Sequence, residues 1–353
     1  MASTTIKQWE TAQDGLDNLK MTQAQKPTAG DGEVLVKIHA VALNYRDTEV
    51  VMGLYGHHAS IKQEEIVPGS DICGTIEVSN SSRWKPGQRV MAIFNQTHLT
   101  GQIRAKDMSS GLGLPLPGCL TEYRVFPADG LVEVPSYLSN EEAACLPIAA
   151  VTAWMSINGF RPIGHPTHSN DETVLIQGTG GVAISGLQIA HAAGMKTIIT
   201  SSSDEKLDKA KALGADHGIN YKSTPDWDQE VMRLTSDNGA DIVLENGGAQ
   251  TLRKSFECVA FGGLINCIGY LSGKEDLSQD RTHTNVLALK RNVTLKGILN
   301  GPRDRFEEMV RFYEKHAIRP VIDRVMRFEE AQEALKYLFS GGHFGKVVVK
   351  VAE

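Results

Sequence analysis

The chain has 353 residues, a length that suits two domains better than one. Apolar residues make up 41% of it and charged residues 22%, which excludes a disordered or fibrous chain. The formal net charge of −6 comes without any basic block, which argues against a surface for nucleic acid or for an anionic membrane. We therefore expect a globular protein with no nucleic acid and no membrane as partner.

The cysteines and the N-terminus bear on where the protein works. The five cysteines include no C-x-x-C pair and are odd in number, which is typical of reduced, buried thiols in an intracellular protein. The first residues lack the basic-then-apolar order of a signal peptide. No apolar run comes close to about 18 residues, the length that a membrane-spanning helix needs. We expect a cytoplasmic protein. The cysteines are Cys73, Cys119, Cys145, Cys258 and Cys267.

The first third of the chain is predicted to be rich in β-strands. Period-two alternation marks three runs, which clusters of Gly, Pro or Asn separate. Because no strand–helix–strand rhythm occurs here, we expect a partly open barrel or an antiparallel sheet. Residues 95–118 have many Gly, Ser and Pro and little periodicity, which predicts a long surface loop. The three predicted strands cover residues 33–42, 73–78 and 88–94.

The pattern changes from about Leu138 onward. Ser139 and Glu142 fit the S-x-x-E capping box of a helix, and strand-like runs then alternate with helical patterns. This alternation predicts a doubly wound parallel sheet, after which the tail is expected to return to the first domain. The predicted strands are 172–177, 196–200, 240–245, 263–269 and 292–297, followed in the tail by 319–328 and 346–351, and the first two helices are 182–193 and 204–213.

The strongest chemical signal is a glycine run that follows a predicted strand and opens a predicted helix. Its first glycine permits a tight turn, its second lets the backbone approach a pyrophosphate, and its last residue keeps the helix close to the strand. The helix N-terminus offers N–H groups and a positive dipole to phosphates. In this setting the run predicts a dinucleotide site rather than an ordinary turn. It consists of Gly178, Thr179, Gly180, Gly181, Val182 and Ala183.

The end of the next strand bears on the choice between NAD and NADP. An NAD site usually has an acid there for the ribose 2′-hydroxyl, whereas this strand ends in small hydroxyls that can bond a 2′-phosphate. A displaced acid, Asp204, is the alternative, and the serines can also be explained as a helix cap. We expect NADPH/NADP as the cofactor. The candidate contacts are Ser201, Ser202, Ser203, Lys206 and Tyr221, with Lys222 as a further cation.

Five more segments accompany the glycine run in order: Leu43–Asp47, Val67–Asp71, Lys85–Val90, Leu146–Trp154 and Gly345–Val349. Together they resemble the medium-chain dehydrogenase/reductase superfamily over essentially the whole chain, and most of all its zinc-independent branch of quinone oxidoreductases and enoyl reductases. The resemblance implies an α/β protein with a GroES-like β-barrel catalytic domain (residues 1–137 and 298–353), a doubly wound Rossmann cofactor domain (138–297) and a cleft between them. It also implies a homodimer through an outer strand near 263–269.

The departures from the zinc-dependent members of that superfamily predict a protein without metal. Those enzymes hold the catalytic zinc with an early Cys, a Gly-His-Glu motif and a later Cys or acid. The corresponding stretches here are 44–47, 69–71 and 146–148, and none has a thiolate or an imidazole at the matching place. Residues 95–118 also lack the four closely spaced cysteines of a structural zinc site. We expect no bound metal.

Without a Lewis acid, hydride addition to an activated double bond is favoured, because a hydroxyl or amide donor can hold the enolate that forms. The expected function is therefore a zinc-independent, NADPH-dependent oxidoreductase that reduces an activated C=C bond (enone or enoyl) or a quinone. An NADP-dependent carbonyl reductase or alcohol dehydrogenase is the alternative among enzymes. An NADPH-binding protein without turnover is the alternative of another class.

Three residues are candidates for the chemistry. Tyr55 matches by position a tyrosine of zinc-free enoyl reductases, which implies a proton donor or a hydroxyl that orients the enolate, and a lid residue is the alternative. Asn44 can bond a carbonyl, a ribose or the nicotinamide amide, and it can equally be an ordinary turn residue. Asp47 can orient Asn44 or form a structural ion pair with Arg46.

The remaining cofactor contacts follow from the resemblance and from the binding of ligands beyond the carboxyl ends of parallel strands. Thr152 lies where the family contacts nicotinamide, although a buried threonine that bonds its own backbone is the alternative. Simple strand-to-loop turns are the alternative for the strand ends, and a surface lysine is the alternative for Lys346. The predicted contacts are Asn44, Thr152, Asn246, Gly247, Ile268, Gly269, Tyr270, Leu299, Asn300 and Lys346.

Overall fold

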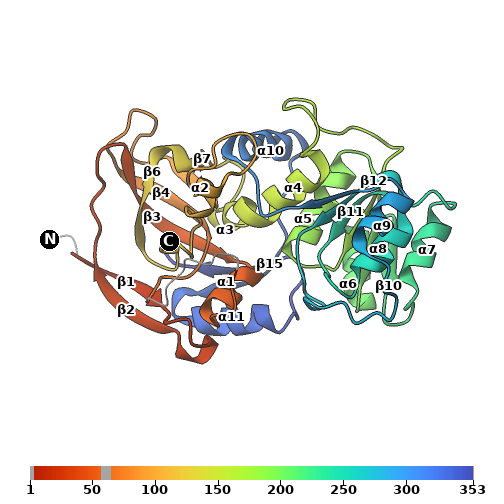
Figure 1. Cartoon of the computed structure of the whole chain (residues 1–353). Coiled ribbons are helices and arrows are strands. Elements are labelled where there is room, and N and C mark those ends of the chain that lie inside the picture. The colour runs from red at the N-terminus through yellow and green to blue at the C-terminus, as the bar shows by residue number, and fades with distance from the viewer. Residues whose placement is uncertain (1–3, 57–64, 353) are drawn as a thin grey trace. The chain divides into compact units, whose positions relative to one another are not determined.

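The computed structural model describes residues 4–56 and 65–352, and the chain divides into two units (Figure 1). The first unit consists of Met1–Val151 and Gly301–Glu353, so both ends of the chain build it. The second unit is Thr152–Asn300. The divisions fall after residues 151 and 300, whereas the sequence places them after 137 and 297.

The first unit extends past residue 137 because the segment that follows packs on its sheet. Ser139 begins helix α3 (Asn140–Ala144), and the predicted capping box is confirmed: Ser139 Oγ accepts from the N–H of Glu142 over 3.1 Å. Asn140 Oδ1 accepts from Arg89 Nε over 3.0 Å, which ties the helix to strand β5. Ile148, in the π-helical turn η3 (Leu146–Ala150), belongs to the core of the first unit.

The main sheet of the first unit, within the described residues, has the order β14-β15-β3-β4-β5-β7, and β6 also pairs with β3. β3 (Glu33–Leu43) pairs antiparallel with β15, β4 and β6. Val34, Val36 and Ile38 are fully buried on its inner face, as period-two alternation requires. The other strands of this unit are β1 (Thr5–Glu10), β2 (Lys20–Gln25), β4 (Asp71–Ser79), β5 (Arg89–Ala92), β6 (Tyr123–Pro127), β7 (Leu131–Glu133), β14 (Ile322–Arg327) and β15 (Lys346–Lys350).

Two helices from opposite ends of the chain lie side by side in the first unit, below the sheet in Figure 1. They are α1 (Tyr45–Val51) and α11 (Ala331–Phe339), and the rings of Tyr45 and Phe339 stack with centroids 6.4 Å apart. This contact helps to place α1, which follows the Asn44 segment. The remaining helices of the unit are α2 (Ala105–Met108), α3 and α10 (Arg303–His316).

The segment 95–118 is a surface loop only in part, because residues 100–106 are mostly exposed whereas residues 110–114 are buried. It contains the short helix α2, and Asn95 and Leu112 are buried. Side chains hold its irregular backbone, since Asn95 Nδ2 donates to the carbonyl of Asp107 over 2.8 Å and Arg46 Nη1 to that of Leu112 over 3.0 Å. Partners far along the chain can satisfy a buried loop in this way, and composition does not reveal them.

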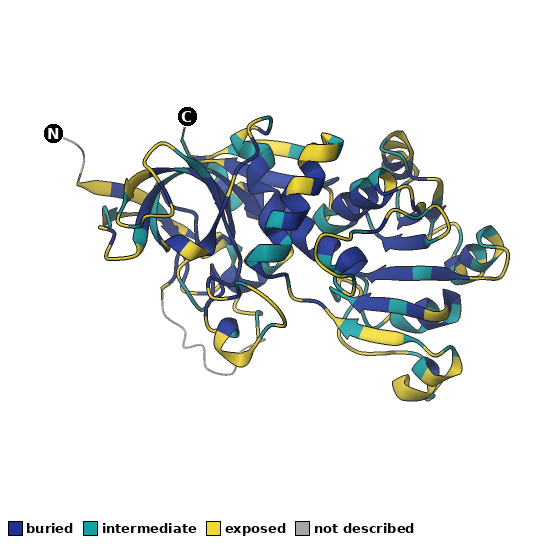
Figure 2. Cartoon of the chain, turned by 90° about the horizontal axis from the view of Figure 1, so that it is seen from above, coloured by how far each residue is buried: buried dark blue, intermediate teal, exposed yellow. Residues whose placement is uncertain are grey.

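The second unit is the predicted doubly wound, Rossmann-like parallel sheet, with the strand order β10-β9-β8-β11-β12-β13 among the described residues. Its inner strands are dark blue in Figure 2, which marks them as buried, and β8 is buried throughout. The elements are α4 (Val151–Asn158), β8 (Thr173–Gln177), α5 (Gly181–Ala192), β9 (Lys196–Ser201), α6 (Asp204–Ala212), β10 (His217–Asn220), α7 (Trp227–Leu234), β11 (Ala240–Glu245), α8 (Leu252–Cys258), β12 (Val259–Cys267), α9 (Thr284–Lys290) and β13 (Thr294–Gly297).

One expectation about this sheet is wrong: the strand near 263–269 is not an outer strand. β12 pairs with β11 on one side and with β13 on the other, so β13 forms that edge. A strand pattern gives no information on sheet order, which explains the error. Among the described residues, no helix combines the length and apolar character needed to cross a bilayer.

Candidate functional site

The glycine run forms the turn from β8 into α5 in the second unit. Gly178 has φ +80°, a region that favours glycine, and a Cβ built there would meet no heavy atom within 4 Å. Thr179 is buried, and Gly180, Gly181 and Val182 are half-buried around the helix N-terminus. No side chain of the described residues caps that terminus. The open turn and the first N–H groups of a 12-residue helix therefore fit a pyrophosphate.

The serines after β9 have different environments. Ser203 is the N-cap of α6, and its Oγ accepts from the N–H of Lys206 over 3.4 Å. Ser201 is buried, and its Oγ accepts from the N–H of Ser203 over 3.3 Å. Ser202 and the side chain of Lys206 are half-buried. The helix-cap explanation therefore holds for Ser203, and Ser202 and Lys206 remain candidates for a 2′-phosphate.

The acid that could serve an NAD ribose lies beyond the end of β9. Asp204 is the first residue of α6, and its Oδ1 accepts from Asn220 Nδ2 over 2.8 Å. Tyr221 is 42% exposed, and its N–H donates to the carbonyl of Ser201 over 3.0 Å. This bond brings Tyr221 to the end of β9, beside the candidate serines.

Two buried residues at neighbouring strand ends, Gln177 and Glu245, are missing from the predicted contacts. Gln177 Nε2 donates to Glu245 Oε2 over 2.7 Å, and Gln177 Oε1 accepts from the N–H of Gly247 over 3.0 Å. Glu245 Oε1 also accepts from the N–H of Gly248 over 2.9 Å. Asn246 Nδ2 donates to the carbonyl of Gln177 over 2.9 Å. The network thus ties Asn246 and Gly247 to the strand that leads into the glycine run. In the sequence, the single acid Glu245 at the end of an apolar strand is the feature that could have revealed this network.

The predicted contacts after β12 adjoin this network. The N–H groups of Ile268 and Gly269 donate to the carbonyl of Glu245 over 2.9 and 3.3 Å. Tyr270 is half-buried, and Lys274 Nζ lies 4.6 Å from the centroid of its ring. The ends of β8, β11 and β12 therefore meet at one edge of the sheet, as the parallel topology requires.

The two ends of the second unit also meet. Asn300 Nδ2 donates to Thr152 Oγ1 over 3.5 Å, and Thr152 is buried. Leu299, the neighbour of Asn300, is 45% exposed. The structure thus brings Thr152 and Asn300 together.

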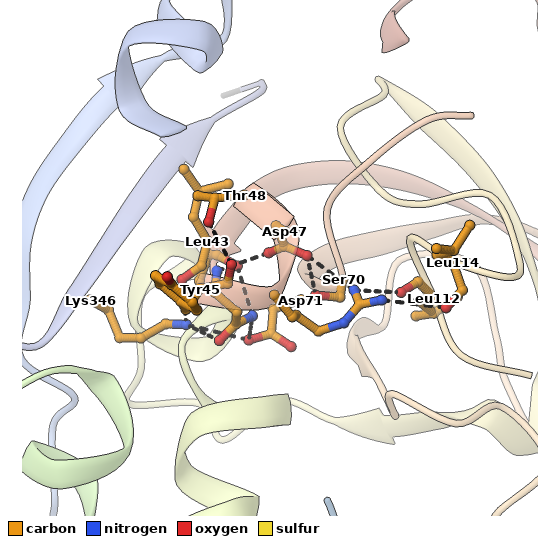
Figure 3. Close-up of polar contacts among 12 residues, drawn as sticks. Leu43, Tyr45, Asp47, Thr48, Ser70, Asp71, Leu112, Leu114 and Lys346 are labelled. Atoms are coloured by element: carbon orange, nitrogen blue, oxygen red, sulfur yellow. Dashed lines mark hydrogen bonds and ion pairs between the residues drawn. The ribbon is translucent and has the colours of Figure 1, made fainter. Parts of the chain in front are cut away.

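In the first unit, a buried lysine joins a polar network (Figure 3). The ammonium of Lys346 donates to the carbonyl of Leu43 over 2.8 Å and to Asn44 Oδ1 over 2.7 Å. It also lies 3.6 Å from Asp71 Oδ2, which accepts from Asn44 Nδ2 over 2.9 Å. Lys346 is therefore not a surface lysine, and both ends of the Asn44 amide have partners within this unit.

The two acids of this network are fully buried. Asp47 accepts from the N–H of Asn44 over 2.8 Å, from Ser70 Oγ over 2.7 Å and from Arg46 Nη1 over 3.1 Å, so it both orients Asn44 and pairs with Arg46. Burial raises the pKa of Asp71 from 3.8 to about 6, although the ammonium of Lys346 and the amide of Asn44 oppose the shift. Asp71 is not among the predicted site residues. Its place beside Ser70 in the Val67–Asp71 segment is the sequence feature that could have pointed to it.

Tyr55 joins the same network through an arginine. It follows α1 and is half-buried, and its ring packs against the cluster of Val50, Ile66 and Leu114. Arg46 Cζ lies 4.6 Å from the centroid of the ring. Asn44, Asp47, Tyr55 and Lys346, which the sequence singles out separately, thus belong to one connected group.

The donors in this group do not fit a catalytic zinc. The stretches that correspond to zinc ligands provide the amide of Asn44, the hydroxyl of Ser70, the apolar side chain of Ile148 and the carboxylates of Asp47 and Asp71. Both carboxylates already accept hydrogen bonds within the group. Zinc prefers three or four sulfur or nitrogen donors, and the one ammonium close by repels a cation. Over residues 4–56 and 65–352, no group of three or more His, Cys, Asp or Glu side chains could hold a metal ion.

Comparisons with known proteins agree with this architecture. A family model described as alcohol dehydrogenase GroES-like domain matches residues 30–136, and one described as zinc-binding dehydrogenase matches 181–315. The zinc-type alcohol dehydrogenase-like protein C1773.06c of Schizosaccharomyces pombe is 40% identical over 340 residues, with 96% of each chain covered. The 2-haloacrylate reductase of a Burkholderia species is 27% identical over 269 residues, which are 74% of this chain and 72% of the other.

Solved structures extend the likeness to the whole chain. A Sinorhizobium meliloti protein, solved as a candidate alcohol dehydrogenase, has a TM-score of 0.87 at 38% identity and covers 99% of this chain and 100% of its own. An NAD-dependent alcohol dehydrogenase has a TM-score of 0.85 at 29% identity, with 98% and 100% covered. The fold and the site define an oxidoreductase with a GroES-like unit and a Rossmann-like unit. The chain belongs to the medium-chain dehydrogenase/reductase superfamily.

Proposed function

We propose that this chain is an NADPH-dependent reductase of activated C=C bonds or quinones that works without a metal. The observation that carries the proposal is the position of the Lys346 ammonium, 2.7 Å from Asn44 Oδ1 and 3.6 Å from Asp71 Oδ2. Both partners belong to stretches where the family's zinc enzymes hold their metal. A fixed cation there, among donors that zinc does not favour, supports chemistry on substrates that carry their own activation.

Reduction of an activated double bond requires a hydride at the β-carbon and a proton at the α-carbon. The hydride is the chemistry that NADPH supplies when it is bound. Negative charge collects on the substrate oxygen, where a hydroxyl can stabilise it. We assign the hydroxyl of Tyr55 to this charge and to delivery of the proton. Because both ends of its amide are paired internally, we assign Asn44, with Asp47, to holding the shape of the site.

The proposal of NADPH rests on the residues after β9. The strand ends in serine rather than in an acid, and the carboxylate of Asp204 already accepts from Asn220. Ser202 and Lys206 are half-buried beside this strand end, and a hydroxyl and an ammonium are groups that bind a 2′-phosphate. A solved relative at 29% identity is named as NAD-dependent, which makes a direct comparison of both cofactors necessary.

The second candidate is an alcohol dehydrogenase or carbonyl reductase. The names of the relatives at 40% and 29% identity favour it. The name of the 2-haloacrylate reductase, whose substrate is an activated alkene, favours the first candidate. The two candidates differ in their substrates and in their need for a metal.

One experiment separates them. Oxidation of NADPH is followed with enones, enoyl thioesters, quinones, aldehydes and ketones, before and after treatment with a chelator, and the metal content is measured by elemental analysis. We expect turnover with enones, enoyl thioesters or quinones, no stoichiometric zinc and no effect of the chelator. One tightly bound zinc per chain, or turnover confined to aldehydes and ketones, would support the second candidate. NADPH binding without turnover of any substrate would indicate a binding protein.

We also propose that the protein is a cytoplasmic homodimer. The edge strand β13 and the helix before it carry exposed apolar side chains, with Leu295 38% and Leu289 79% exposed. An open strand edge and apolar side chains can pair with the same surface of a second copy. Light scattering at micromolar concentration tests this, and a monomer would contradict it.

A further inference from the structure

The guanidinium of Arg46 lies over the rings of Tyr55 and Phe94. Its Cζ is 4.6 Å from the ring centroid of Tyr55 and 4.8 Å from that of Phe94, and its side chain is only 10% exposed. Arginine stacks on aromatic faces through its flat cationic group, and the attraction grows when water is excluded. One face of the cation therefore meets the residue to which we assign proton transfer.

Hydrogen bonds fix the guanidinium from its edge. Nη1 donates to the carbonyl of Leu112 over 3.0 Å and to Asp47 Oδ1 over 3.1 Å, and Nη2 donates to the carbonyl of Leu114 over 3.3 Å (Figure 3). Gly113, between these carbonyls, has φ +76°, and a Cβ there would lie 3.2 Å from Nη1. The glycine at position 113 thus lets the turn present both carbonyls to the guanidinium without a side chain in the way.

Asp47, which accepts from Arg46, is also held rigidly. Asp47 is fully buried and accepts from Ser70 Oγ and from the N–H of Asn44, so it cannot follow Arg46 if the arginine moves. Val50, Ile66 and Leu114 also pack against the Tyr55 ring, and their apolar contacts are not directional. The guanidinium therefore supplies the directional contact that these apolar side chains lack.

We propose that Arg46 is a positioning residue that fixes the ring of Tyr55, and with it the direction of the hydroxyl. The inference rests on the proposed function for its catalytic consequence, but the contact itself can be tested without turnover. A lysine cannot replace the arginine, because it lacks the flat face and the fork of donors that reach Leu112 and Leu114 together.

Kinetics provide the first test. Arg46→Met should lower kcat about 10- to 100-fold, as a misplaced reacting group does, and leave the Kd for NADPH within about twofold. In a Tyr55→Phe background the same change should cost less than about twofold, because a residue that acts through Tyr55 has nothing left to position. Equal losses in both backgrounds would overturn the proposal. Arg83→Met is the matched control, since Arg83 lies over Trp84 at 5.4 Å, and it should leave kcat unchanged.

A spectroscopic test does not depend on turnover. With 3-fluorotyrosine placed only at position 55, the ¹⁹F signal should be a single narrow line that shifts and broadens in Arg46→Met but not in Arg83→Met. An unchanged line would overturn the positioning role. Arg46→Lys keeps the charge and disturbs folding least. Its kcat and its ¹⁹F line should resemble those of Arg46→Met. If they instead match those of the unaltered protein, the proposal is overturned. If Tyr55→Phe leaves turnover intact, the catalytic assignment of Tyr55 fails while the ¹⁹F result still decides on Arg46.

Discussion

Lys346 Nζ donates to Asn44 Oδ1 over 2.7 Å, and this bond joins residues 302 positions apart in the chain. It connects the first residue of β15 to the residue before α1. The same ammonium faces Asp71, and Asn44 donates to that carboxylate, so the three side chains hold one another in place.

Lys346→Met should lower the free energy of unfolding by about 3–5 kcal/mol, the range for breaking a buried ion pair. The cause is Asp71, which would remain buried without its counter-charge. Titration with denaturant measures the loss. Lys350→Met, at an exposed position of the same strand, is the control and should change the value by less than about 0.5 kcal/mol. Lys346→Met combined with Asp71→Asn should recover part of the loss, and a double variant no more stable than the single one would contradict the pairing.

Asp71→Asn should change how stability depends on pH. The pKa of Asp71 is raised from 3.8 to about 6 in the folded chain, so between these values the folded chain binds a proton that the unfolded chain has lost. The contribution of this group is therefore most favourable below a pH of about 4 and declines by about 3 kcal/mol as the pH rises through 6.

The difference in unfolding free energy between the unaltered protein and Asp71→Asn, measured from about pH 4 to 7, isolates this contribution from the other carboxylates. It should fall as the pH rises. A difference that stays constant over this interval would mean that Asp71 titrates at its ordinary pKa.

Gly178→Ala should weaken NADPH binding about tenfold or more, because the added methyl group would occupy the turn that a pyrophosphate approaches. Gly164→Ala is a matched control, since both glycines have positive φ (+80° and +86°) and neither Cβ would meet an atom within 4 Å. Each change should cost about 1–2 kcal/mol of stability from backbone strain alone. Fluorescence titration with NADPH separates the two effects, and equal affinities of the two variants would contradict the placement of the site.

Lys206→Ala should weaken NADPH binding by about 1–3 kcal/mol, the range for a hydrogen bond to a charged group, and spare NADH. Lys211→Ala, on the same helix and paired with Asp208 at the surface, should affect neither cofactor. Calorimetric titration with both cofactors measures the difference. An equal loss for NADPH and NADH would show that Lys206 does not contact a 2′-phosphate.

The features predicted well from the sequence depend on neighbours in the chain. Periodicity, glycine spacing and a three-residue interval predict five strands of the second unit (all but β10), the helix after the glycine run and the Ser139 capping box. Such signals are local, because each reports the preferred conformation of a few successive residues. They do not report sheet order, which is why the outer strand is assigned to 263–269 although β13 forms the edge.

The sequence by itself therefore determined the parallel sheet of the second unit, the β-rich character of the first unit and the glycine turn. Tertiary structure alone decided that Lys346 is buried against Asn44, that Arg46 lies over the rings of Tyr55 and Phe94, and that Arg46 also binds the carbonyls of Leu112 and Leu114. The physical reason is that a buried charge or an irregular buried backbone needs partners, and here the partners come from distant parts of the chain. Local patterns carry no record of which distant residues the fold will bring together.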